Sequence, residues 1–105
     1  MARQHDDMAR IFKALCDSNR LIILDMLRNG EKCACEILDG FLISQSTLSH
    51  HMKILCDSEI VVCESRGKWK YYSLGKQGLE RAYHILAELV ECTEIEYSAS
   101  TANCE

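Results

Sequence analysis

The sequence contains no proline, no low-complexity segment, no internal repeat and no long hydrophobic run. No apolar stretch approaches the ~20 residues that a transmembrane helix requires, so we expect no membrane-spanning segment. The first ten residues are polar and carry Arg3, Asp6, Asp7 and Arg10, a pattern that excludes a secretory signal peptide. We therefore expect a cytoplasmic protein that has no membrane partner.

The composition is that of a small globular domain. The chain has 105 residues, of which 48% are hydrophobic and 27% are charged, so extensive disorder is not expected. We predict one domain over residues 1–98, followed by a flexible tail over residues 99–105. A core of this size is modest, and dimerisation would help to stabilise it.

Charge is unevenly distributed along the chain. The formal net charge of −4 argues against a protein that binds nucleic acid over its whole surface. From Gln77 onward the acidic side chains greatly outnumber the basic ones, whereas the segment 44–73 carries Lys53, Arg66, Lys68 and Lys70. A locally basic face on an acidic protein is compatible with DNA binding.

Cysteine is abundant for a chain without a secretion signal. Because the number is odd, complete internal pairing into disulfides is impossible, and in the cytoplasm we expect reduced thiols. Metal binding or redox sensing therefore ranks above a disulfide framework for these seven residues: Cys16, Cys33, Cys35, Cys56, Cys63, Cys92 and Cys104.

Apolar spacing predicts helices over the first half of the chain. A first amphipathic helix covers residues 8–15, and a second is capped by Asp17 or Ser18 and ended by Gly30. In the second helix we expect a wide apolar face, which includes Leu21, Ile22, Leu24, Met26 and Leu27. A short third helix is predicted over residues 33–39.

A helix, a hairpin and a long helix complete the pattern. Ser44 is the predicted N-cap of the fourth helix, and the segment 60–74 reads as two strands with Gly67 at the tip. In this hairpin we expect Cys63, Trp69 and Tyr71 on the core side. The last helix runs from Gln77 into the mid-nineties. The fold class is mainly α with a small β-hairpin, a winged helix-turn-helix whose first and last helices remain for a homodimer.

The fourth helix has an outer face of unusual composition. With Leu48, Met52 and Leu55 inward, the outer face offers hydroxyl, amide and imidazole groups in place of the glutamate and lysine of an ordinary solvated helix. Such groups can contact base edges and phosphates in a major groove, although a face that meets only water remains the alternative. The hairpin tip adds basic residues beside this helix. The predicted DNA contacts are Gln45, Ser46, Thr47, Ser49, His50, Lys53, Arg66 and Lys68.

The segments "ALCDSNRLIILDMLRNGEKCACEIL" and "SQSTLSHHMKILCDSEIVVCESRGKWKYYSL" together resemble the ArsR/SmtB family of metal-responsive winged-helix repressors over residues 8–75. One departure is Ser18, where the family often has proline at the helix start. The resemblance implies a homodimer that binds a palindromic operator and releases it when an inducer ion binds. No other cofactor is required.

Within this family "EKCACEIL" resembles the motif of the arsenic-responsive repressors, so the resemblance assigns Cys33 and Cys35 as ligands for trivalent arsenic or antimony. Soft ions prefer thiolates. A third cysteine often follows three residues later in the family, but Leu38 stands there. We expect the third thiolate from Cys104 or Cys92, from the same or the partner subunit, with Cys16 and Cys56 as alternatives. Two thiolates would suffice for a monosubstituted organic arsenical.

On a regular helix the side chains of Cys33 and Cys35 point about 200° apart, so one ion bound to both would deform the first turn. The same spacing means that both cannot face one core, which argues against simple packing residues.

Other functions remain open. A cadmium- or lead-responsive repressor of the same family and a thiol redox switch are alternatives. A zinc sensor is less well supported because the last helix offers only His84 and Glu88 as a ligand pair. No catalytic constellation is present, so we expect no enzyme activity.

Overall fold

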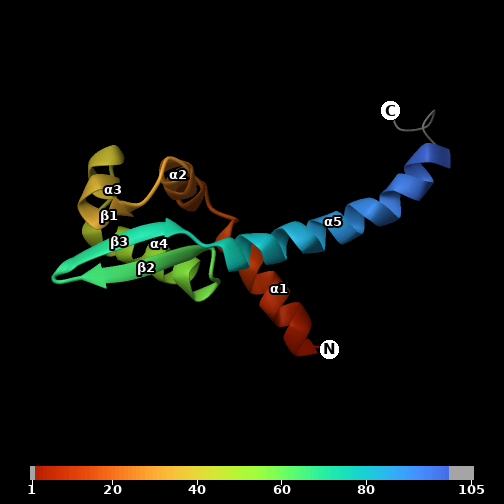
Figure 1. Ribbon diagram of the computed structural model, residues 1–105, viewed down its shortest axis with the longest axis horizontal. Coiled ribbons are helices and arrows are strands. Elements are labelled where there is room, and N and C mark those ends of the chain that lie inside the picture. The colour runs from red at the N-terminus through yellow and green to blue at the C-terminus, as the bar shows by residue number, and fades with distance from the viewer. Residues whose placement is uncertain (1, 100–105) are drawn as a thin grey trace.

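The computed structural model describes residues 2–99, and the side chains of residues 4–93 within them. Three helices and a short strand come first: α1 (Ala2–Ala14), α2 (Ser18–Leu27), β1 (Lys32–Cys33) and α3 (Ala34–Gly40). The remaining elements are α4 (Gln45–Asp57), β2 (Val61–Arg66), β3 (Trp69–Leu74) and α5 (Lys76–Ala99). In Figure 1 the β2–β3 hairpin projects to one side, whereas α5 leads away from it in the opposite direction. The fold is a winged helix-turn-helix, as predicted.

The sheet has three antiparallel strands in the order β1-β3-β2. The wing is closed by a two-residue turn in which Gly67 has a φ of +63°, a conformation that suits glycine at the first position of a type II′ turn. Strand β1 was not predicted. It pairs Lys32 with Tyr72 and Cys33 with Tyr71, so the segment before α3 is part of the sheet.

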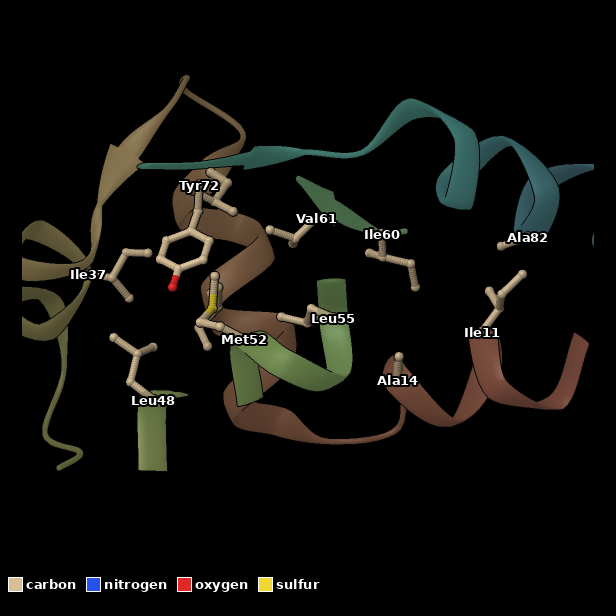
Figure 2. Packing of buried hydrophobic residues seen from close by; sticks show 12 residues of the cluster. Ile11, Ala14, Ile37, Leu48, Met52, Leu55, Ile60, Val61, Tyr72 and Ala82 are labelled. Carbon is tan, nitrogen blue, oxygen red and sulfur yellow. The ribbon is translucent and has the colours of Figure 1, made fainter. Parts of the chain in front are cut away.

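The core lies between the helices and the inner face of this sheet. Figure 2 shows Tyr72 among Ile37 of α3 and Met52 of α4, while Ile11 of α1 lies beside Ala82 of α5. Leu48, Met52 and Leu55 are all buried, which confirms the predicted inner face of α4. Helix α4 is therefore fixed to the rest of the domain by its apolar side.

Several predicted core positions were wrong. Leu21 and Ile22 are exposed on α2, whereas their neighbour Ile23 is fully buried, because Ile23 and Leu27 share the face that meets the core. In the wing, Trp69 is exposed on the outer face, whereas Cys63 lies on the inner face as predicted but is exposed rather than buried. The core residue is Tyr72, which lies on the opposite face of β3 from Tyr71 since side chains alternate along a strand.

None of the helices within residues 2–99 is long and apolar enough to cross a membrane. Residues 100–105, which include Cys104 and most of the predicted tail, lie outside the described part of the chain.

Candidate DNA interface and thiol site

The recognition helix α4 begins at a side-chain cap. The hydroxyl oxygen of Ser44 accepts a hydrogen bond from the backbone N–H of Thr47 at 3.1 Å, which satisfies one of the otherwise unpaired donors at the helix start. All six residues of α4 predicted to contact DNA are exposed: Gln45, Ser46, Thr47, Ser49, His50 and Lys53. The structure thus places them together on the outer face of α4, opposite its buried apolar residues.

A buried arginine holds the inner side of α4. Arg20 of α2 donates from Nε to the carbonyl oxygen of Ala14 at 2.8 Å and from Nη2 to that of Lys13 at 3.2 Å. Its Nη1 lies 3.1 Å from Nδ1 of His51. Because a guanidinium can only donate, Nδ1 accepts and the ring hydrogen is on Nε2. One side chain therefore joins the end of α1, the start of α2 and the recognition helix.

The two predicted DNA contacts of the wing have different surroundings. The Lys68 side chain is exposed at the hairpin turn, with its ammonium 5.6 Å from the centre of the Trp69 ring. Arg66 instead forms a bidentate ion pair with Glu31, at 3.0 and 2.7 Å, and a second pair with Glu64 at 2.8 Å. These carboxylates raise the pKa of the Arg66 guanidinium. Arg66 is thus held against the body of the domain, and Lys68 is the more available cation.

Cys33 and Cys35 lie at the junction of β1 and α3. Cys33 is the extended N-cap of α3, with φ −82° and ψ 162°, and its N–H donates to the Glu36 carboxylate at 2.9 Å. Cys35 is exposed in the first turn, and the neighbouring Cys33 thiol raises the pKa of Cys35. The prediction that both cysteines lie within one helix was wrong. Because Cys33 precedes the helix and is extended, the separation of about 200° expected between the two side chains on a regular helix does not apply.

A groove connects Cys35 with several of the predicted DNA contacts. It has a volume of about 490 Å³ and lies between α3, α4 and β3. Its lining includes Cys35, Gln45, Ser49, Lys68, Lys70 and Tyr72. A ligand on the thiols would therefore lie at the edge of the surface that carries the predicted base contacts.

Of the two residues predicted to supply the third ligand, Cys92 does not lie beside this pair within one chain (Figure 1). Cys92 is exposed in the last third of α5, which leads away from β1 and α3 in Figure 1, and Cys104 lies outside the described residues. In the described part of the chain, no group of three or more histidine, cysteine, aspartate or glutamate side chains could hold a metal ion. The structure supplies two thiols at this position.

Sequence reasoning missed Glu31 and His51. Glu31 binds the wing from the loop before β1, and nothing in the local sequence distinguishes it from an ordinary surface carboxylate. His51 was visible as a histidine between the inward positions Leu48 and Met52, and it is buried. Its position beside inward-facing residues indicated from the sequence that the His51 ring would need a polar partner inside the domain.

Comparison with known proteins bears on the same segments. Residues 17–62, which contain α2, β1, α3 and α4, match the family model described as "Bacterial regulatory protein, arsR family". An arsenical resistance operon repressor of Staphylococcus aureus is 49% identical over 70 residues, which cover 67% of both chains. The chain belongs to the arsR family. The relatives of this arsR-family protein are transcriptional regulators and not enzymes.

Two further curated relatives differ in the kind of resistance that their names state. The arsenical resistance operon repressor of Bacillus subtilis is 40% identical over 82 residues, 77% of this chain and 75% of the relative. A cadmium resistance transcriptional regulatory protein homologue of Staphylococcus aureus is 37% identical over 89 residues, 79% of this chain and 74% of that one. Membership in the family therefore does not by itself identify the ion that acts as inducer.

Solved structures agree with the fold. An ArsR family transcriptional regulator matches with a TM-score of 0.78 at 25% identity and covers 85% of this chain and 92% of its own. A homodimeric winged helix-turn-helix DNA-binding domain from Mycobacterium bovis matches with a TM-score of 0.70 at 28% identity, over 91% and 88% of the two chains. This arsR-family protein is a winged-helix, DNA-binding transcriptional repressor.

Proposed function

We propose that this repressor acts in the cytoplasm as a homodimer that binds a palindromic operator and releases it when trivalent arsenic or antimony binds Cys33 and Cys35. The observation that carries the proposal is the position of Cys33 and Cys35 at the β1–α3 junction, where Cys35 lines the same groove as Gln45 and Lys68. Soft trivalent ions prefer thiolate ligands. The ligand site and the DNA-contacting surface are therefore adjacent.

The homodimer is supported by the apolar surface of α5. Tyr83, Leu86, Leu89 and Val90 are large hydrophobic residues with at least half of their surface exposed, on the helix that also packs against α1. Such a contiguous exposed apolar face is typical of an interface. A twofold dimer would present two copies of α4, which is the arrangement that a palindromic operator requires.

Strand β1 supplies a route from the ligand to the wing. Cys33 pairs with Tyr71 of β3, and Glu31, two residues earlier, holds Arg66 at the end of β2. A ligand that draws the Cys33 and Cys35 sulfurs to one ion must reorient residue 33, which is also the N-cap of α3. Ligation would thereby loosen the pairing of β1 and move the wing and α4 out of register with the DNA.

The number of cysteine thiolates at the site determines which chemical form of arsenic or antimony it can bind. Arsenite or antimonite would complete a three-sulfur site with Cys92 of the partner subunit, or with Cys104 of the same or the partner subunit. A monosubstituted organic arsenical needs only two thiolates, which Cys33 and Cys35 would supply.

Fluorescence anisotropy of labelled operator DNA, bound by the fully reduced protein and titrated with arsenite, tests the function. We expect the DNA to be released when arsenite reaches the concentration of the sites. Release by cadmium but not by arsenite would replace the inducer with the ion of the cadmium alternative. Release by peroxide alone, with no effect of either ion on reduced protein, would establish the redox switch instead.

Replacing Lys68 by alanine tests the wing contact. Because a lysine that neutralises a phosphate releases counterions, we expect weaker binding to all DNA sequences and a salt slope reduced by about 1. Lys76→Ala, at the exposed start of α5, is the matched control and should leave the slope unchanged.

Replacing Gln45 by alanine tests base reading by α4. The expected result is a loss of discrimination between operator and unrelated DNA of about 1–3 kcal/mol, because a base-edge contact contributes only on the correct sequence. Binding to operator and to unrelated DNA would be measured at one salt concentration. Equal weakening on both would show that Gln45 contacts only the backbone.

A further inference from the structure

A second pair of cysteines, separate from Cys33 and Cys35, lies where the recognition helix meets the wing. Cys56 is in the last turn of α4 and is half-buried, and Cys63 is in β2 and is exposed. Helix α4 and strand β2 pack against each other, and both cysteines line one groove of about 430 Å³. The two thiols thus face the same space although six residues separate them in the sequence.

The register of the wing orients Cys63 toward this space. Side chains alternate along a strand, so Cys63 shares a face with Val61, which is buried against the core. Its partner across the ladder is Tyr72, another core residue. Cys63 is therefore on the inner face of the hairpin, at the point where the core ends and the groove begins.

The electrostatics agree with this geometry. Burial and the neighbouring Cys63 thiol raise the pKa of Cys56 to about 11. Burial, followed by the thiols of Cys63 and Cys56, raises the pKa of Tyr72 to about 12. Cys56, Cys63 and Tyr72 therefore form one cluster, and Cys56 is a neutral thiol at physiological pH.

We propose that Cys56 and Cys63 form a dithiol site for a monosubstituted trivalent arsenical, independent of the Cys33–Cys35 pair. Only two donors are available, because the described residues contain no group of three that could hold an ion. An arsenical with one carbon substituent needs two sulfurs and no third. Its organic group has an apolar wall to pack against, since Val61 and Val62 also line the groove.

The reaction is a condensation without a redox step. Each S–H bond breaks as an As–S bond forms, and the protons leave with the oxygen of the arsenical as water. Arsenic remains trivalent. Because neutral thiols can condense with an As–OH group, the high pKa of Cys56 does not prevent the reaction. The product joins the last turn of the recognition helix to β2.

The test uses the full reduced chain with Cys33→Ser and Cys35→Ser, so that its result does not depend on the proposed function. Phenylarsine oxide is added at one equivalent, free thiols are alkylated under denaturing conditions, and tryptic peptides are weighed. The sequence places Cys56 and Cys63 alone together in the tryptic peptide spanning residues 54–66. We expect both of these thiols to be protected from alkylation.

Further serine substitutions in the same chain test the contributions of individual cysteines separately. Adding Cys56→Ser or Cys63→Ser should each weaken phenylarsine binding roughly hundredfold or more, because the second As–S bond is intramolecular. Adding Cys16→Ser, at an exposed thiol after α1, should leave it unchanged. The proposal is wrong if peptide 54–66 is fully alkylated, or if the adduct persists in either Cys56→Ser or Cys63→Ser.

Discussion

Replacing Cys33 or Cys35 by serine is expected to abolish arsenite-driven release of the operator while leaving DNA affinity within about twofold of the parent protein. Serine preserves the volume of each side chain, and at position 33 it is a better N-cap than cysteine, so α3 should keep its start. A hydroxyl is a poor ligand for a soft ion, and one remaining thiolate cannot chelate it. Anisotropy titrations of both variants with arsenite measure the effect.

The control for these variants is Cys16→Ser, which removes an exposed thiol without touching β1, α3 or the groove. This variant should release operator DNA at the same arsenite concentration as the parent protein. If Cys33→Ser or Cys35→Ser instead fails to bind operator in the absence of any ion, the two cysteines are structural and the proposed inducer site is incorrect.

Replacing Arg20 by alanine is expected to lower the free energy of unfolding by about 3 kcal/mol, the largest stability effect that we predict. The side chain is buried, and its loss would leave the carbonyl of Ala14 and Nδ1 of His51 without their donor. Since these acceptors lie on α1 and α4, the recognition helix would also lose its polar anchor. Urea unfolding followed by circular dichroism gives the value.

Arg28→Ala is the matched comparison, since Arg28 lies at the opposite end of the same helix and pairs with Asp25 at 3.0 Å in an exposed ion pair. Its expected cost is below about 0.5 kcal/mol, because exposed pairs contribute little. Similar costs for the two variants would show that the buried hydrogen bonds of Arg20 do not stabilise the fold.

The wing shows where local patterns were insufficient. Alternation of β-branched and aromatic residues predicted the hairpin and the glycine at its tip. It did not decide which face of the hairpin would meet the core, because aromatic residues occupy consecutive positions 71 and 72 and either face could be buried. A change of one residue in register exchanges the two faces, which is why Trp69 and Tyr71 were assigned inward and Tyr72 is the buried residue.

The sequence by itself determined the order of helices and wing, the cap at Ser44, the inward and outward sides of α4 and the supply of thiols. Each of these follows from residues within a few positions of one another, whose spacing and chemistry act locally. Only the tertiary structure decided that residues 32 and 33 form a strand, since that strand exists only through its pairing with β3. The same pairing places Cys33 opposite Tyr71 of β3, and the ion pair of Glu31 with Arg66 links this segment to the wing. Contacts between residues more than thirty positions apart depend on the packed core, and no local pattern encodes them.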